Sequence, residues 1–118
     1  MQFLVYDPNF DPDDATLPSP ETMQEMGAFM AEAAQAGVVV LTGALKPEGT
    51  RLSYQDGKIS VTDGPYIELK ELMAGFAVLE VPSLEQAVEW SRRFRKIIGE
   101  GVSEIVPLYG PQDFEAPD

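Results

Sequence analysis

Hydrophobic and polar residues repeat along the chain with two different periods, and these periods predict its secondary structure. Short apolar runs or alternations, which are typical of strands, cover residues 2–6, 38–41, 75–81 and 102–109. Apolar residues recur at helical spacing over 19–36 and over 83–98, so each of these segments is expected to form an amphipathic helix. Ser91 falls on the apolar stripe of the second helix. Residues 38–41 are apolar without interruption, which predicts a strand covered on both faces.

Cap and turn residues mark the ends of these elements. Ser19 before Pro20, and Ser83 three residues before Gln86, are signals for the start of a helix. Asp56-Gly57 lies between two strand-like segments, 51–55 and 58–62, and this dipeptide predicts a β-hairpin. The expected order is therefore strand, helix, strand, hairpin, strand, helix, strand.

Without the hairpin, this order is the split β-α-β arrangement called ferredoxin-like, which is an α+β fold. Two amphipathic helices would cover one face of an antiparallel sheet. The other face also carries apolar residues, because Phe76 and Val78 point opposite to Ala77 and Leu79. A second copy would cover that face, so we expect a homodimer.

The length of the chain, 118 residues, suits one hydrophobic core. We expect a single domain over 1–109, followed by an acidic tail over 110–118. No apolar run has the length of a membrane helix, and the first residues lack the basic flank and apolar core of a secretory signal. The expectation is therefore a cytoplasmic bacterial protein that does not associate with membranes.

The balance of charged residues argues against nucleic acid as a partner. The formal net charge is -12, whereas phosphate backbones are bound by clustered Lys and Arg. One small basic cluster comprises Arg92, Arg93, Arg95 and Lys96. We interpret it as a solvated face near a helix C-terminus, with a binding patch as the alternative. Trp90, in the same segment, is either an interface anchor or a partly exposed flank.

The chain has no cysteine and no histidine, which narrows the chemistry open to it. Thiol nucleophiles are excluded, and so is the side chain that most often serves as a base near neutral pH. Four aspartates lie within residues 7–14, but their spacing fits no calcium loop. We expect a solvated loop there, no metal and no cofactor.

Residues 61–71, VTDGPYIELKE, join a Gly-Pro pair to several charged side chains at the end of a strand pattern. Asp63-Gly64-Pro65 predicts a rigid turn. Two interpretations stay open: the turn is purely structural, or it presents charged groups to a cleft. In the second, Asp63, Lys70 and Glu71 are candidate ligand-binding residues, because Lys70 can hold an anion and a carboxylate can move a proton.

Tyr6 ends the first strand and is a fourth candidate for ligand binding. Its hydroxyl would point into a pocket, or its ring would belong to the core with the oxygen at the rim.

In order and spacing, several segments together resemble the YCII-related, or DGPF-domain, family. The resemblance rests on Gly37 with its apolar strand, Gly43 to Pro47, Asp56-Gly57, Asp63-Gly64-Pro65-Tyr66, and Ser83 to Ala87. It implies a dimeric α/β barrel of the ferredoxin-like type, with a cleft between sheet and helices on each subunit. It also implies varied roles: some relatives are enzymes with a His-Asp pair, many have no known activity, and some are encoded beside extracytoplasmic-function sigma factors.

This chain departs from the family pattern at two points that concern function. Without histidine, the His-Asp chemistry does not carry over, and Val106 stands where the family usually has Arg. We therefore expect a dimeric small-molecule-binding or regulatory module whose ligand is small and anionic or aromatic. The alternative is a lyase- or isomerase-like enzyme acting on a small aromatic or carbonyl compound, with Asp63 or Glu71 as base and Lys70 as electrostatic partner. A purely structural interaction domain is a third interpretation.

Overall fold

The computed structural model of the chain describes residues 1–9, 18–45, 48–65 and 75–114. Its elements are β1 (Gln2–Tyr6), α1 (Pro20–Gln35), β2 (Val39–Ala44), β3 (Glu48–Gln55), β4 (Lys58–Pro65), β5 (Gly75–Glu80), α2 (Leu84–Ile98), β6 (Glu104–Pro107) and the short 3₁₀ helix η2 (Pro111–Phe114). The predicted order of helices and strands is confirmed, with ends that differ by a few residues.

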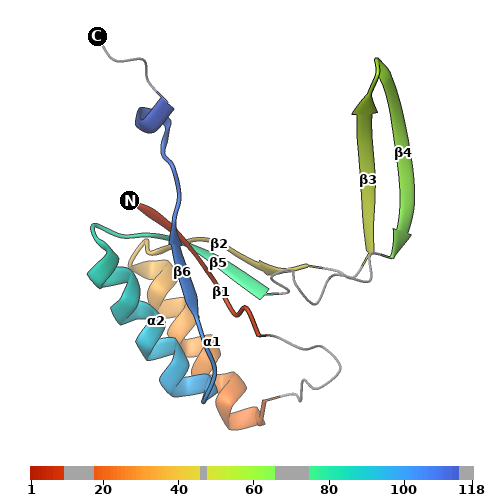
Figure 1. The fold of residues 1–118 in the computed structure, drawn as a ribbon. Coiled ribbons are helices and arrows are strands. Elements are labelled where there is room, and N and C mark those ends of the chain that lie inside the picture. The colour runs from red at the N-terminus through yellow and green to blue at the C-terminus, as the bar shows by residue number, and fades with distance from the viewer. Residues whose placement is uncertain (10–17, 46–47, 66–74, 115–118) are drawn as a thin grey trace.

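Four strands form one antiparallel sheet in the order β2-β5-β1-β6. Both helices lie on the same face of this sheet (Figure 1). Because β5 lies between β1 and β2, the first β-α-β unit is split. The fold is therefore α+β, and its strand order is compatible with the ferredoxin-like arrangement.

The predicted caps and turns determine where the elements begin and end. The Ser19 hydroxyl accepts a hydrogen bond from the Thr22 amide at 3.1 Å, and the Ser83 hydroxyl accepts one from the Gln86 amide at 3.3 Å. Each serine thus satisfies one of the amides that the first turn of a helix leaves unpaired. Asp56 and Gly57 both have positive φ, 53° and 74°, as the tight turn of a two-residue β-hairpin requires.

The core lies between the sheet and the helices. Its buried side chains are Phe3, Val38, Leu79, Val81 and Ala87. Phe3 and Leu79 are cross-strand partners that face the helices, so their neighbours in sequence face the other way.

Two of those neighbours, Leu4 and Val78, belong to a row of apolar side chains on the face of the sheet without helices. Leu4 pairs with Val78 on one side and with Val106 on the other, and Val78 pairs with Leu41. We call Leu4, Leu41, Val78 and Val106 the open face. The second apolar face predicted from the sequence is therefore present.

The prediction that the apolar run 38–41 is covered on both faces is wrong for a single copy of the chain. Val38 is buried, but the rest of the run is in β2, which is an edge strand. There Val40 and Leu41 are 54% and 55% exposed. An apolar run indicates that both faces of a strand require cover, but it does not say whether the same chain provides it.

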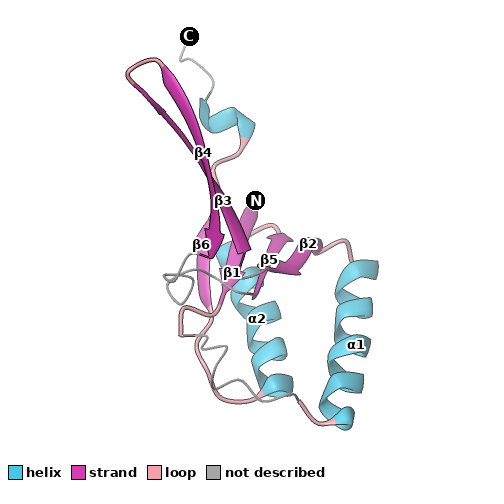
Figure 2. Cartoon of the chain, turned by 90° about the vertical axis from the view of Figure 1, so that its right-hand side faces the viewer, coloured by secondary structure: helices cyan, strands magenta, loops and turns pink. Residues whose placement is uncertain are grey.

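Among the described strands, β3 and β4 pair with each other and with no other strand, and they form a hairpin, which we call the arm (residues 48–65). It rises from the sheet on the side opposite to the helices and stands clear of them (Figures 1 and 2). The arm makes the molecule extended: its radius of gyration is 17.5 Å, against about 13.5 Å for a compact domain of this length.

The rigid turn predicted at Asp63-Gly64-Pro65 is also wrong. These three residues continue β4 and pair with Thr50, Gly49 and Glu48. The strand ends of a two-stranded hairpin have no further neighbours, and Gly and Pro are tolerated at such edges.

Candidate ligand-binding cavity

A cavity of about 630 Å³ lies between the sheet and the two helices. Its volume is within the range of about 300–1,000 Å³ that is usual for small-molecule sites. Five aromatic residues contribute to the lining: Tyr6, Phe29, Phe76, Trp90 and Phe94. The Phe29 ring centroid lies 5.8 Å from that of Trp90 and 6.3 Å from that of Phe94, so these three form an aromatic cluster between α1 and α2.

The spacing of residues on α2 explains why this helix contributes so much to the cavity. Residues Trp90, Ser91, Phe94, Arg95 and Ile98 all line the cavity. They follow the i, i+3, i+4 pattern of one helical face. The sequence of α2 therefore places one hydroxyl and one guanidinium among aromatic and aliphatic groups on the side that faces the sheet.

Ser91 is the most unusual polar group in the cavity. Its side chain is buried, with 8% of the residue exposed, and its hydroxyl has no hydrogen-bond partner among the described residues. A buried hydroxyl without a partner destabilises a protein by about 1–3 kcal/mol, so almost all such groups are paired. The Ser91 hydroxyl can donate one hydrogen bond and accept others.

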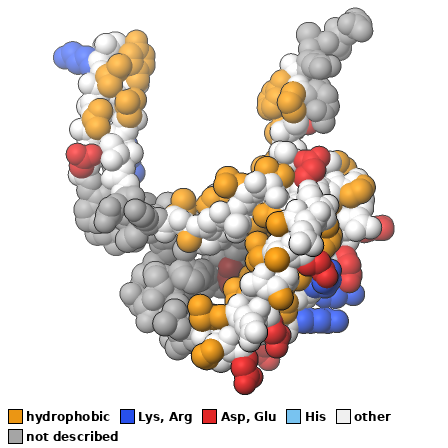
Figure 3. Space-filling model, turned by 180° about the vertical axis from the view of Figure 1, so that it is seen from behind, with side chains coloured by type: hydrophobic (Ala, Val, Ile, Leu, Met, Phe, Trp, Pro, Cys, Tyr) orange, Lys and Arg blue, Asp and Glu red, His pale blue; other side chains and the backbone are white. Residues whose placement is uncertain are grey.

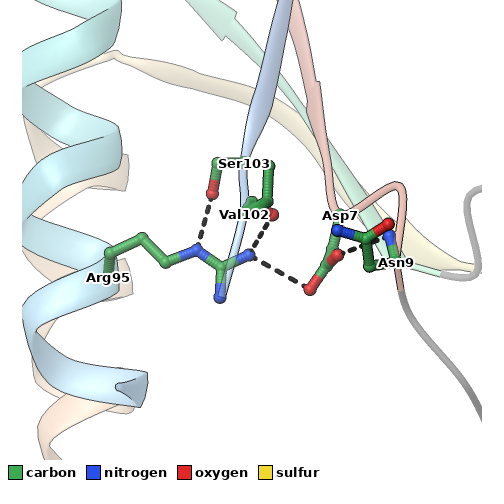
Figure 4. A network of polar contacts seen from close by, with 5 residues as sticks. All are labelled: Asp7, Asn9, Arg95, Val102 and Ser103. Atoms are coloured by element: carbon green, nitrogen blue, oxygen red, sulfur yellow. Dashed lines mark hydrogen bonds and ion pairs between the residues drawn. The ribbon is translucent and has the colours of Figure 1, made fainter. Parts of the chain in front are cut away.

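Arg95 organises the polar end of the cavity (Figure 4). Its Nε donates to the Ser103 hydroxyl at 2.8 Å, and its Nη2 donates to the Val102 carbonyl and to Asp7 Oδ2, the latter at 3.2 Å. Asp7 Oδ1 accepts in turn from the Asn9 amide at 2.8 Å. The ion pair is shielded from solvent, because the Arg95 side chain is only 19% exposed.

Gly101 allows Arg95 to take this position. Its φ is +155°, and a Cβ atom at this residue would collide with the guanidinium of Arg95. The absence of a side chain at 101 therefore keeps open the space that Arg95 occupies between α2 and β6.

Of the four predicted site residues, the structure describes Tyr6 and Asp63, and of these two Tyr6 lines the cavity. Tyr6 lines it at the end of β1, although strand alternation puts the ring on the same side as Leu4. Asp63 lies on the arm, where its Oδ1 accepts from the Thr50 hydroxyl at 3.1 Å, and it is not among the cavity residues. Lys70 and Glu71 fall outside the described residues.

Sequence reasoning missed Asp7, Ser91 and Arg95 as site residues. It placed Arg95 on a solvated basic face, and the structure corrects this, because Arg95 points between α2 and the sheet and is paired there. The signal was present: Arg95 follows Ser91 by four residues, and Ser91 belongs to the predicted apolar stripe. Asp7 carried no such signal, because its partner is 88 residues away in sequence.

The neighbouring Arg93 is not simply solvated either. Its guanidinium carbon lies 5.1 Å from the Phe29 ring centroid and 4.8 Å from that of Trp90, and it pairs with Glu32 of α1. Trp90 is thus half-buried between the cavity and Arg93, and its ring joins the two helices.

Two kinds of feature are absent from the described ranges. Within them, no group of three or more His, Cys, Asp or Glu side chains could hold a metal ion. Neither α1 nor α2 combines the length and the apolar character that crossing a membrane requires.

Comparison with known proteins gives two findings. One curated protein, an uncharacterized protein of Rhizobium meliloti (strain 1021), is 29% identical over 72 residues, which are 59% of this chain and 58% of that protein. The aligned segment therefore spans less than two thirds of the relative. The family model of the YCII-related domain matches residues 1–110, which is nearly the whole chain. The chain therefore belongs to the YCII-related family.

Proposed function

We propose that this YCII-related protein is a binding or regulatory module that holds a small aromatic molecule in the cavity between sheet and helices. The observation that carries the proposal is the Ser91 hydroxyl, which is buried without a described partner in the wall of a largely apolar cavity. A ligand with one hydrogen-bonding group would satisfy this hydroxyl. Its ring would contact Phe29, Trp90 and Phe94.

The charges around the cavity favour an uncharged ligand over an anion. Arg95 is the one basic residue among the described lining residues, and it is already paired with Asp7. The formal charge of this lining is therefore zero, in a chain whose net charge is -12. An anion would have to compete with Asp7 for Arg95, and the field of the whole protein would repel it.

The module is proposed to act as a homodimer. The open face leaves Leu41 and Val106 exposed on one side of the sheet, at 55% and 39%. Packing this face against that of a second copy would bury the apolar row of both sheets, as in two-layer sheet packing.

The ligand proposal is tested with three matched probes: para-propylphenol, para-propyltoluene and para-propylbenzoate. Trp90 is the only tryptophan of the chain and lines the cavity, so its fluorescence reports on binding there. We expect the phenol to bind most tightly, the toluene about two- to ten-fold more weakly for want of one hydrogen bond, and the benzoate more weakly than the phenol. Titration calorimetry of the three probes measures the order directly.

Two variants on α2 show whether binding occurs in this cavity. Ser91→Met fills the space beside the aromatic cluster, and it is expected to abolish phenol binding. Val88→Met adds the same side chain on the same helix at a position that does not line the cavity, and it is expected to leave binding unchanged. If none of the probes binds, or if both variants bind the phenol like the parent chain, the proposed ligand site is wrong.

A further inference from the structure

The arm has one apolar and one polar face. Leu52 lies opposite Val61 and Tyr54 opposite Ile59, and directly opposed residues share a face of a hairpin. These four side chains are strongly exposed: Leu52 64%, Val61 61%, Tyr54 69% and Ile59 64%. The intervening pairs on the other face are Arg51 with Thr62 and Ser53 with Ser60. The arm is therefore amphipathic, yet its apolar side is uncovered.

An uncovered arm of this kind is not expected to be stable on its own. A two-stranded hairpin in water is marginally stable at best and needs a third strand or a packed face. Its apolar face also forms one contiguous patch, and contiguous patches of this kind mark interaction sites. Figures 1 and 2 show that neither helix provides cover, because the arm rises on the other side of the sheet.

A second projection rises from the same side of the sheet. The segment after β6, with η2 at its end, leaves the sheet opposite to the helices (Figures 1 and 2). It carries Tyr109 and Phe114, whose ring centroids are 5.5 Å apart and which are 79% and 75% exposed. Figure 3 shows hydrophobic side chains on both projections and along the sheet surface between them.

The arm enlarges the contact that the open face alone would offer to a second copy. Four strands about 4.8 Å apart and five residues of about 3.3 Å each give a footprint of about 320 Å². A standard interface buries about 800 Å² on each partner. The arm, with two strands of eight residues, adds roughly 250 Å². Its length of about 26 Å exceeds the width of about 19 Å of the four-stranded sheet, so it reaches across a second molecule seated on the open face.

We propose that the arm closes over a second copy of this chain, which sits with its open face on the open face of the first. The inference deepens the homodimer put forward above and rests on it. By two-fold symmetry each copy extends one arm and receives one, so both apolar hairpin faces become buried. The arm contains three acidic and two basic residues and so carries a net charge of -1 out of -12, which keeps its repulsion from a second acidic body small.

The main test compares two double variants of the full chain. Leu52→Asp/Val61→Asp places two carboxylates on the apolar face, and Ser53→Asp/Ser60→Asp places two on the polar face; both are directly opposed pairs. Each variant places two like charges opposite each other on the hairpin, so the two variants differ mainly in the face that carries the charges. In sedimentation velocity at micromolar concentration, we expect the parent chain and the polar-face variant at twice 12.9 kDa. The apolar-face variant is expected to dissociate at least ten-fold more readily.

A cross-linking measurement places the arm on its partner even if a variant folds poorly. The photo-reactive residue p-benzoyl-phenylalanine in place of Tyr54 is expected to give covalent dimers on irradiation, and in place of Ser60 only traces.

Three results would overturn the inference. The parent chain could sediment as a monomer, which would also remove the proposed dimer. The apolar-face variant could dimerise like its control, or Tyr54 could fail to cross-link, and either would leave the sheet-to-sheet dimer and the ligand site standing.

Discussion

At the scale of single residues, Ser91 connects the folding of this protein to its proposed function. The hydroxyl is desolvated beside an apolar cavity, and nothing in the described chain compensates for that loss. The free protein is therefore less stable than its core would allow, and a ligand that reaches the hydroxyl recovers part of this difference.

Ser91→Ala is predicted to raise the free energy of unfolding of the ligand-free protein by about 1 kcal/mol. The variant removes a desolvated polar group and introduces the residue with the highest helix propensity. Urea unfolding measures the change, and the same variant is expected to bind para-propylphenol about two- to ten-fold more weakly.

Ser103→Ala is the matched control, because the Ser103 hydroxyl accepts a hydrogen bond from Arg95. It is expected to lower the free energy of unfolding by about 1 kcal/mol. If Ser91→Ala destabilises the protein as much as Ser103→Ala does, the Ser91 hydroxyl has a partner, and the argument for a ligand fails.

The sequence could predict that Ser91 lies on the inner stripe of its helix, because helical periodicity is a local property. It could not predict that the hydroxyl lacks a partner, because that depends on groups from β1, β2 and β5. Arg95 was misplaced for a related reason. Its neighbours Arg92, Arg93 and Lys96 suggested a solvated cluster, whereas Asp7 and Ser103, which hold it, lie on other elements.

At the scale of elements, α2 is central, since it lines the cavity and provides Ala87 to the core. It begins at Ser83, whose hydroxyl accepts from the Gln86 amide. The side chains of α2 that line the cavity follow two turns later. The position of the cap therefore influences which residues of α2 face the cavity.

Ser83→Ala is predicted to lower the free energy of unfolding by about 1 kcal/mol, the usual effect of losing an N-cap. Ser60→Ala, on the exposed polar face of the arm, is the control and is expected to change it by less than about 0.5 kcal/mol. Thermal unfolding followed by circular dichroism distinguishes the two. Equal effects of the two variants would mean that the cap contributes nothing to the stability of α2.

Helices, caps and the Asp56-Gly57 turn were predictable because each depends on a few neighbouring residues. The error at Asp63-Gly64-Pro65 has a physical origin in the arm. Gly and Pro usually end a strand, but β3 is the one described neighbour of β4, so these residues interrupt little pairing. The exposure of β2 was not predictable either. A strand covered by its own chain and a strand covered by another copy have the same apolar sequence pattern.

At the scale of the whole molecule, two apolar surfaces of one chain remain uncovered on the same side of the sheet. The open face and the arm are separate in sequence, yet each leaves apolar side chains exposed in the single copy, and each is proposed to be covered by a second copy. The stability of the arm is therefore expected to depend on protein concentration, whereas that of β1 and β5 depends on the core that each copy contains.

Hydrogen exchange followed by mass spectrometry tests this expectation. Amides of residues 48–65 are predicted to exchange rapidly at nanomolar concentration and at least ten-fold more slowly at high micromolar concentration. Amides of β1 and β5 are predicted to change little, and they serve as the internal control. Exchange in the arm that is equally slow at both concentrations would show that the arm is stable without a second copy.

The arm is one uninterrupted stretch of sequence inserted between two strands of the sheet, and none of its residues lines the described part of the cavity. In the proposed dimer, mutations in the arm would therefore change which chains pair without changing the ligand that the cavity of each subunit binds. In a cell that makes several related chains, the sequence of the arm would then determine whether each chain forms a homodimer. A few substitutions in the arm would allow two related chains to form a heterodimer.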